Sequence, residues 1–460
     1  MALIKSISGI RGTIGGKVNE NLTPLDVVKF TSAFGAWLQN NKNKKDLTLV
    51  VGRDARISGA MVNSLVTATL QGLGIHVVDL GLSTTPTVEV MVPELNADGG
   101  IILTASHNPK QWNALKLLNE KGEFITGENG AEVLALAEAE DFNYAEVDDL
   151  GKYETRGDGF AIHIQKILNL PMVDAEAIKS KKYKIVVDAV NSTGGIAIPE
   201  LLEHLGCEVI KLYCEPNGQF PHNPEPLKEH LGDICELVKK EKADLGIVVD
   251  PDVDRLALVD ENGELFGEEY TLVAVADYLL KNKKGSAISN LSSSRALRDV
   301  ALKHDSQYFA SAVGEVNVVT LMKAENAVIG GEGNGGIIYP DLHYGRDSLV
   351  GVALFLTHLA KENKTVSELR ATYPSYFMGK KKIELTPDID VDSLLTKMEK
   401  EYQNEEVSTV DGVKIDFEKN WVHLRKSNTE PIIRIYTEAF SQEEADNLGD
   451  QMIAKIKSLI

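Results

Sequence analysis

The sequence has little cysteine, no long hydrophobic run and too few basic residues to balance its acidic ones. Three cysteines occur in 460 residues, without the paired spacing of a metal site, and this usage indicates a reducing cytoplasm. The absence of an apolar run long enough to span a bilayer, or of a secretory signal, argues against a membrane or exported protein. Lysine and arginine number 48 against 68 aspartates and glutamates, a net charge of −20. The electrostatic field of this net negative charge repels nucleic acid and anionic membranes, so we expect neither as a partner. For the same reason, binding of an anionic substrate needs a local cluster of Arg and Lys.

What the chain does contain is one pattern of alternating strands and helices, written three times. The copies open with the strand-like segments 47–51, 183–188 and 286–289, and each ends in an apolar strand and a distinctive loop. This alternation predicts mixed or parallel sheets covered on both faces. The region after about residue 375 does not follow this alternation: charged helical stretches come first and strand-like segments follow. It predicts a smaller α+β domain.

The loop of the first copy is Ser106-His107-Asn108-Pro109, after the apolar strand 100–103. His-Asn-Pro is turn chemistry, so Ser106 lies outside the carboxyl end of a strand, where α/β sheets present reactive groups. When this motif is considered by itself, an ordinary turn is the alternative to a reactive Ser106.

The loop of the second copy contains three alternating aspartates, Asp250, Asp252 and Asp254. We expect an extended segment whose carboxylates point the same way. Three close carboxylates resist ionisation unless a cation lies between them, and Mg²⁺ with a phosphate completing its shell suits them. A calcium loop is rejected because Arg255 occupies the sixth position, where glycine is required. A solvated acidic turn is the alternative.

The loop of the third copy, 331–336, matches the dinucleotide-binding pattern G-x-G-x-x-G only formally, because an extended segment follows it instead of a helix. Glu332 and Asn334 suit hydrogen bonding to a polyhydroxyl ligand, with a plain glycine-rich turn as the alternative. In the last region, residues 425–431 and Arg434 combine hydroxyl, backbone N–H and guanidinium groups, as a phosphate-binding loop does. A charged surface turn is the alternative there.

These loops, together with Gly9-Ile10-Arg11-Gly12 at the start, resemble in order the motifs of the α-D-phosphohexomutase superfamily, which includes phosphoglucomutases, phosphomannomutases and phosphoglucosamine mutases. The resemblance covers nearly the whole chain. It implies an α/β fold of four domains around a central cleft, three with a repeated mixed α/β sandwich topology and a smaller C-terminal α+β domain. We expect a phosphoserine-loop domain at 1–152, a metal-binding domain at 153–258, a sugar-binding-loop domain at 259–373 and a phosphate-binding domain at 374–460.

The resemblance also implies roles for individual residues. Ser106 would carry a phosphoryl group, and that phosphate would bind Mg²⁺ together with Asp250, Asp252 and Asp254. Residues that orient the transferring group or move protons would be Arg11, His107 and Lys116. Substrate would be bound by Arg255 at the transferring group, by Glu332 and Asn334 at sugar hydroxyls, and at the other phosphate by Arg425, Ser427, Asn428, Thr429 and Arg434.

The implied activity interconverts hexose 1- and 6-phosphates through a hexose 1,6-bisphosphate, which is both intermediate and activator. We expect phosphoglucosamine mutase activity in a cytoplasmic monomer or homodimer, with phosphomannomutase/phosphoglucomutase activity as the alternative. The chain has Gly335-Gly336 where many bacterial members place a histidine, and Asn428 where phosphoglucosamine mutases often have glycine, so substrate choice stays open. Alternatives of another class are a serine phosphohydrolase, which needs no second phosphate loop, and a sugar-phosphate binding protein.

Overall fold

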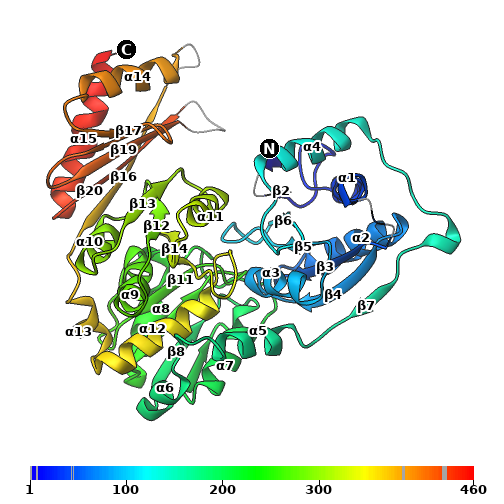
Figure 1. Ribbon diagram of the computed structural model, residues 1–460, viewed down its shortest axis with the longest axis horizontal. Coiled ribbons are helices and arrows are strands. Elements are labelled where there is room, and N and C mark those ends of the chain that lie inside the picture. Colours follow the sequence, from blue (N-terminus) through cyan, green and yellow to red (C-terminus); the bar gives the residue numbers. More distant parts are fainter. Residues whose placement is uncertain are drawn as a thin grey trace. The chain divides into compact units, whose positions relative to one another are not determined.

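Strands and helices alternate through most of the chain in the computed structural model, and an antiparallel sheet follows them (Figure 1). The structure describes residues 3–6, 9–42, 44, 46–385, 389–426 and 432–459. The chain forms two units, Met1–Thr271 with Asn334–Leu369 and Leu272–Gly333 with Arg370–Ile460. Among the described helices, none combines the length and the apolar character needed to cross a membrane.

The first unit contains a seven-stranded sheet. Strands β3, β4, β5 and β7 are mutually parallel where they pair, whereas β6 runs antiparallel to both of its neighbours. Helix α1 packs between α2 and α4, and α3 packs on β3 and β5. The order across the sheet is β1 (Leu3–Ser6), β2 (Gly9–Thr13), β6 (Trp112–Leu118), β5 (Gly99–Leu103), β3 (Thr48–Arg53), β4 (His76–Leu82), β7 (Tyr153–Thr155), and the helices are α1 (Pro24–Lys42), α2 (Gly59–Gly72), α3 (Thr85–Glu94) and α4 (Gly127–Ala139).

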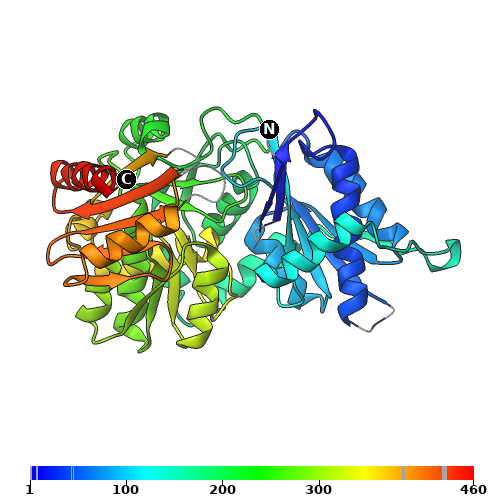
Figure 2. The ribbon, with the colours of Figure 1, turned by 90° about the horizontal axis from the view of Figure 1, so that it is seen from above.

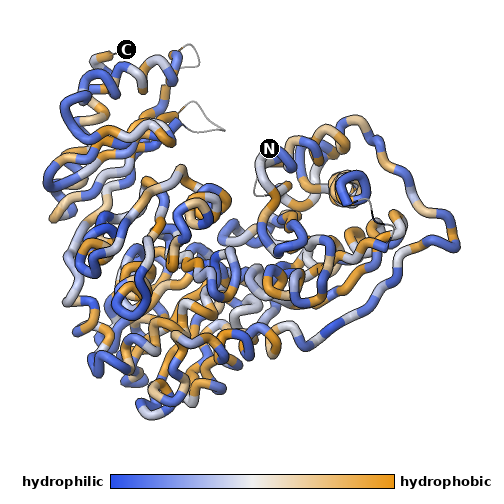
Figure 3. Tube along the Cα trace, in the orientation of Figure 1, coloured by the Kyte–Doolittle hydropathy of each residue, from blue (hydrophilic) through white to orange (hydrophobic). Residues whose placement is uncertain are grey.

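Both faces of this sheet are buried, as its apolar strands predict. Leu49 and Val51 of β3 face the core formed with α1, α2 and α4, whereas Val50 between them faces the core formed with α3. This division follows from the two-residue period of a strand, which sends successive side chains to opposite faces. Hydrophobic positions accordingly gather along the strands (Figure 3).

A second, four-stranded sheet of the same unit has the order β11 (Leu256–Val259), β10 (Leu245–Val249), β8 (Lys184–Asp188), β9 (Glu208–Leu212), with only β11 antiparallel. Helix α12 (Ser348–Glu362) is apolar around its whole circumference and is almost entirely buried, as such a helix must be. It packs against α5, α6 and α7. The other elements are α5 (Gly159–Leu168), α6 (Ala175–Lys181), α7 (Gly194–His204), α8 (Gly232–Glu241), β15 (Gly336–Ile338), α13 (Val366–Arg370) and the 3-10 turns Val147–Asp149 and Lys228–His230.

The second unit holds two sheets. In the first, β12 (Ala287–Asn290) lies between β13 (Tyr308–Ser311) and β14 (Ile329–Glu332), all parallel. The C-terminal sheet is wholly antiparallel and packs its core against α14 and α15 (Figure 2). Its order is β16 (Phe377–Glu384), β20 (Ile432–Ala439), β19 (Trp421–Lys426), β18 (Val413–Asp416), β17 (Glu406–Ser408), and the helices of the unit are α9 (Glu268–Asn282, which begins in the first unit), α10 (Ala296–Lys303), α11 (Glu315–Ala324), α14 (Val391–Glu401) and α15 (Gln442–Leu459).

The threefold repeat predicted from the sequence is confirmed. In each copy the first strand (β3, β8 or β12) lies between the second (β4, β9 or β13) and the third (β5, β10 or β14). The loops expected to carry the chemistry follow the third strand in the first two copies, whereas in the third copy Glu332 is the last residue of β14 and the loop begins after it. The small C-terminal α+β domain is confirmed as well.

Candidate active site

Ser106 follows β5, whose five residues are all buried, and it is itself only 8% exposed. Its backbone is in the left-handed region, with φ of +48°, which is uncommon for a residue other than glycine. The Ser106 N–H donates to Thr104 Oγ1 at 3.0 Å, and Ser106 Oγ donates to Asp250 Oδ2 at 2.9 Å. The serine hydroxyl therefore points at the aspartate loop of the second sheet.

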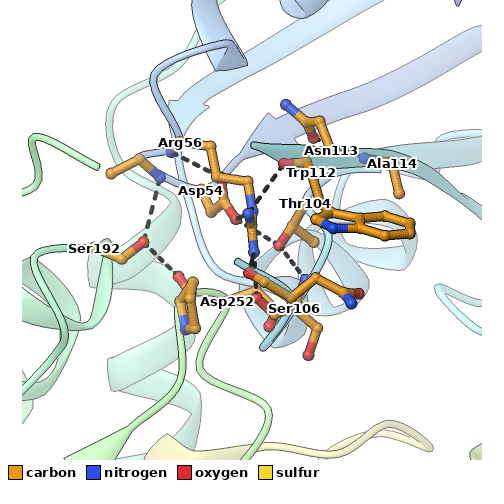
Figure 4. Close-up of polar contacts among 12 residues, drawn as sticks. Asp54, Arg56, Thr104, Ser106, Trp112, Asn113, Ala114, Ser192 and Asp252 are labelled. Atoms are coloured by element: carbon orange, nitrogen blue, oxygen red, sulfur yellow. Dashed lines mark hydrogen bonds and ion pairs between the residues drawn. The ribbon is translucent and has the colours of Figure 1, made fainter. Parts of the chain in front are cut away.

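A buried arginine holds the backbone of the serine loop (Figure 4). Arg56 is 1% exposed and donates from Nη2 to Ser106 O and Asn108 O, both at 2.6 Å. From Nη1 it donates to Pro109 O at 2.7 Å and to Trp112 O at 3.0 Å, and from Nε to Asp54 Oδ2 at 3.0 Å. All five N–H donors of the guanidinium are thus used, so the loop has one well-defined path.

Ser192 connects this loop system to the aspartate loop (Figure 4). Its Oγ accepts from the Ala55 N–H at 3.3 Å and donates to Pro251 O at 2.7 Å. Thr104 Oγ1 donates to Asp54 Oδ2 at 2.6 Å on the other side of the network. The hydrogen bonds of Ser192 therefore join the loops of the first two sheets, in addition to the hydrogen bond between Ser106 and Asp250.

Asp250, Asp252 and Asp254 are fully buried and converge, but not in the way we expected. The segment is a turn, with Val253 at φ of +66°, and not an extended strand. Asp250 Oδ1 accepts from the N–H groups of Asp254 and Arg255, both at 3.1 Å, which closes the turn. Ligand atoms of the three carboxylates lie within 4.8 Å of one another because the loop folds back, not because of a two-residue period.

The electrostatics of the triad favour a bound cation. Burial, with the charges of Asp254 and Asp252, raises the pKa of Asp250 well above its ordinary value. Burial also opposes ionisation of Asp252, but the Lys116 ammonium outweighs it and lowers the pKa of Asp252. Among the described residues, Asp252 Oδ1 and Asp254 Oδ1 are buried without a hydrogen-bond partner. Oxygen donors of this kind fit a hard divalent cation such as Mg²⁺.

Three further groups orient the triad. Lys116 Nζ donates to Asp252 Oδ2 at 2.7 Å and lies 3.6 Å from Asp254 Oδ2. Thr85, the first residue of α3, donates from Oγ1 to Asp252 Oδ2 at 2.6 Å. Arg346 Nη2 donates to Asp254 Oδ2 at 2.7 Å. Burial lowers the pKa of Lys116, but the charges of Asp252 and Asp254 outweigh it and raise the pKa above its ordinary value.

The other predicted cations also lie beside the serine loop. Arg11 Nη1 donates to Asn108 Oδ1 at 3.4 Å, and burial together with the charge of Arg255 lowers the pKa of Arg11. Arg255 Nη1 donates to Glu225 Oε1 at 3.1 Å. Burial and the charge of Arg255 lower the pKa of His107, whose Nδ1 is 3.3 Å from Ser106 Oγ. The cation cluster that a strongly acidic chain needs for an anionic substrate is therefore present in this unit.

The predicted sugar-binding residues fall on either side of the boundary between the two units. In the second unit Glu332 Oε1 accepts from Asn290 Nδ2 at 2.9 Å and from the Gly314 N–H at 3.2 Å. In the first unit Asn334 Oδ1 accepts from the Gly336 N–H at 3.2 Å. Strand β15 follows this loop, so the rejection of a dinucleotide-binding fingerprint is confirmed.

The predicted phosphate loop lies between β19 and β20 of the second unit. Arg425 and Arg434 are cross-strand partners, and Arg425 Nε lies 2.8 Å from Asp411 Oδ2. Two like charges directly opposite each other are unfavourable unless an anion or a carboxylate offsets them. The other residues assigned to this loop, Ser427, Asn428 and Thr429, lie outside the described residues.

Sequence reasoning missed several members of the site. Arg56 and Asp54 lie in a loop that the repeat marks as the carboxyl end of β3, which was the available signal. Thr85 and Arg346 had only weak signals, a helix start and the residue before a helix-capping aspartate. Their contacts with the aspartate loop span 167 and 92 residues of sequence. No local pattern reports partners at such distances.

Family models of phosphoglucomutase/phosphomannomutase match the chain from end to end. The alpha/beta/alpha domains I, II and III match residues 4–144, 161–263 and 267–376, and the C-terminal domain matches residues 382–455.

Full-length relatives are similar to this chain over nearly the same length. A phosphoglucomutase/phosphomannomutase of Thermococcus kodakarensis is 38% identical over 94% of this chain and 95% of its own. A phosphoglucosamine/phosphogalactosamine mutase of Sulfurisphaera tokodaii is 34% identical over 98% of each chain. The crystal structure of a phosphoglucomutase/phosphomannomutase family protein from Burkholderia thailandensis superposes with a TM-score of 0.85 at 25% identity, covering 99% of this chain and 98% of the other.

Proposed function

The chain belongs to the phosphoglucomutase/phosphomannomutase family, as its motifs suggested, and we propose that it interconverts glucosamine 1-phosphate and glucosamine 6-phosphate. It is a phosphohexomutase, an intramolecular phosphotransferase. The glucosamine assignment draws its support from full-length relatives named as phosphoglucosamine mutases.

The observation that carries the mechanism is the contact between Ser106 Oγ and the buried aspartate loop. A phosphoryl group on Ser106 would lie beside Asp250, Asp252 and Asp254, whose carboxylates would repel it in the absence of a cation. Mg²⁺ held by these three residues and the phosphate would neutralise charge on the transferring group. We assign that donor set to the metal site.

The reaction exchanges one phosphoryl group between serine and sugar. A free hydroxyl oxygen of the hexose phosphate attacks the phosphorus of phospho-Ser106, the P–Oγ bond breaks, and the hydroxyl proton passes to Ser106 Oγ, giving a hexose 1,6-bisphosphate. After the sugar reverses its orientation, Ser106 Oγ attacks the phosphorus of the other phosphate, the bond from that phosphorus to the sugar oxygen breaks, and the serine proton passes to that oxygen. Phosphoryl transfer depends on position and charge, and Arg11, Lys116 and Arg255 supply positive charge and orientation around Ser106. His107, within reach of Ser106 Oγ, is assigned to relaying this proton as a neutral imidazole, because its lowered pKa leaves it uncharged at neutral pH.

The other phosphate of the substrate needs a separate site that accepts either end of the sugar. The opposed pair Arg425 and Arg434 fits that need, because a phosphate between two guanidinium groups removes their mutual repulsion. Ser427, Asn428 and Thr429 would contribute hydroxyl, amide and backbone groups. Glu332 and Asn334 are assigned to sugar hydroxyls.

A second candidate is a dual phosphomannomutase/phosphoglucomutase, and one observation favours it. The relative in Thermococcus kodakarensis, which carries that name, is 38% identical, above the 34% of the relative named for glucosamine and galactosamine.

The test compares turnover of the 1-phosphates of glucosamine, glucose and mannose by the purified protein, with Mg²⁺ and a catalytic amount of a hexose 1,6-bisphosphate. We expect kcat/KM to be highest for glucosamine 1-phosphate and phosphopeptide mass spectrometry to find phosphate on Ser106. Ser106→Ala should abolish turnover, whereas Ser64→Ala, at an exposed serine of α2, should not change it.

Each failure has a distinct meaning. A higher kcat/KM for mannose or glucose 1-phosphate would replace the glucosamine assignment with the second candidate. Release of inorganic phosphate without isomerisation would indicate a phosphohydrolase. Persistent absence of phosphate on Ser106 would leave a sugar-phosphate binding protein.

A further inference from the structure

Behind the aspartate loop, two histidines and two carboxylates are buried at a junction of three segments from distant parts of the sequence. Glu89 belongs to α3, His163 to α5, and His343 and Asp347 to the segment that leads into α12 (Figure 1). Thr87 of α3 completes the group, which we call the junction cluster. Its members are between 0% and 9% exposed.

The members of the junction cluster form a chain of polar contacts that begins and ends on α3, and we call this chain the circuit. Thr87 Oγ1 is 3.0 Å from His163 Nδ1, and His163 Nε2 is 3.0 Å from Asp347 Oδ2. The same Asp347 oxygen is 3.3 Å from His343 Nε2, and His343 Nδ1 is 3.3 Å from Glu89 Oε2. The circuit thus starts and ends on α3 and crosses the other two segments on the way.

A positive charge lies between two negative ones in the circuit. Burial alone would lower the pKa of His343, but the hydrogen bond to Asp347 and the carboxylate charges of Glu89 and Asp347 outweigh it and raise the pKa to about 10. His343 is therefore an imidazolium between two carboxylates at neutral pH. The other oxygen of Asp347 accepts from the N–H groups of Leu349 and Val350, so one aspartate both caps α12 and binds the two histidines.

Gly345 shows how closely the segment before α12 is held against α3. A Cβ atom at this position would lie 1.9 Å from Glu89 Oε2, so only glycine permits the approach. Breaking the circuit would therefore leave this backbone held by packing alone.

Two of the three segments, α3 and the segment before α12, also supply a hydrogen-bond donor to the aspartate loop. Thr85, two residues before Thr87, donates to Asp252, and Arg346, adjacent to Asp347, donates to Asp254. The backbone follows the same pattern, because the Thr85 N–H donates to Asp252 O and the Ser348 N–H donates to Val253 O. Every one of these contacts depends on the position of a segment that the junction cluster holds.

We propose that Glu89, His163, His343 and Asp347 are positioning residues of the metal site: their circuit holds Thr85 and Arg346, and through them sets the geometry of Asp252 and Asp254. The proposal rests on the metal site of the proposed function. Groups that orient metal ligands commonly change metal affinity by about 10- to 100-fold when removed, and the circuit acts one contact further out.

The test measures Mn²⁺ affinity by electron paramagnetic resonance, independently of turnover. The double variant Glu89→Gln/His343→Gln removes one charge of each sign, so a change in affinity reports geometry and not net charge. We expect a loss of about tenfold, at the lower end of that range. We also expect a lower kcat that recovers at high Mg²⁺, with little change in KM for the sugar phosphate. The matched control is Glu203→Gln/His204→Gln at the exposed end of α7, which should leave affinity and turnover unchanged.

Circular dichroism and chemical unfolding establish that the variants are folded. If the double variant does not fold, Thr87→Val, which keeps every charge, should lower Mn²⁺ affinity in the same direction by a smaller factor. Wild-type Mn²⁺ affinity in a folded variant would overturn the proposal. So would a tightly bound Zn²⁺ or Co²⁺ that is lost in His163→Gln, because the cluster would then be a metal site itself. A wild-type protein that binds no Mn²⁺ would instead refute the metal site of the proposed function.

Discussion

Replacing Arg56 with lysine should damage the serine loop far more than its conservative character suggests. The guanidinium makes five hydrogen bonds, four to backbone carbonyls of residues 106–112 and one to Asp54. A lysine ammonium has only three donors, so at least two of these buried or partly buried acceptors lose their partner. At about 1–3 kcal/mol for each buried acceptor left unsatisfied, and less for a partly exposed one, the cost is at most about 6 kcal/mol, which is comparable to the stability of many domains.

Chemical denaturation and steady-state kinetics measure the two consequences. We expect a lower unfolding midpoint and, because Ser106 loses its fixed position, a kcat reduced by about 100-fold with a smaller change in KM. Arg53→Lys, at the last residue of β3, is the matched control. Its guanidinium has one described hydrogen bond, to Asp54 O, and the substitution should cost no more than about 0.5 kcal/mol. Equal midpoints and equal kcat values in the two variants would refute the argument.

Three further outcomes are expected. Chelation with EDTA should abolish mutase turnover and added Mg²⁺ should restore it, whereas full activity after chelation would remove the metal from the mechanism. Arg425→Ala should weaken substrate binding by roughly 1.5–3 kcal/mol, about a 10- to 150-fold increase in KM, and an unchanged KM would remove the phosphate-loop assignment. Because the pKa of His343 is about 10 in the folded protein and about 6.5 when unfolded, the folded state holds an extra proton between these values. The stability that His343 contributes is therefore complete below pH 6.5 and is lost as pH rises toward 10. Urea unfolding at pH 7, 8 and 9 should show a decline steeper in the wild type than in His343→Gln by up to about 1.4 kcal/mol per pH unit, and equal slopes would contradict the assignment.

The part of the site that could be predicted from the sequence is the part written in local patterns. Apolar strands followed by turn residues located Ser106 and Asp250, and the repeat placed them at equivalent strand ends. The shape of the aspartate loop was predicted wrongly, because an alternating pattern does not reveal the left-handed residue Val253 that turns the chain. The contact between His163 and Asp347 spans 184 residues of sequence. A buried polar pair at that separation produces no periodic pattern in the sequence, so it could not be predicted. Local chemistry is therefore visible in the sequence, whereas the buried polar groups that hold it are not.

The charges of the first unit explain why the proposed mechanism needs the C-terminal loop. Five cations lie around the serine and aspartate loops, namely Arg11, Arg56, Lys116, Arg255 and Arg346, and they meet five carboxylates, the aspartate triad, Asp54 and Glu225. In the proposed mechanism a phosphate on Ser106, of about −2 charge, would be offset by a divalent metal, so the site would have no positive charge left for a second phosphate. The second phosphate of the sugar must therefore find its counter-charge elsewhere. Arg425 and Arg434 can supply it because each lies opposite the other and, among the described residues, the ion pair that the structure shows for them is the one between Arg425 and Asp411. In a chain with a net charge of −20, the doubly phosphorylated intermediate of the proposed mechanism would therefore draw on both sites.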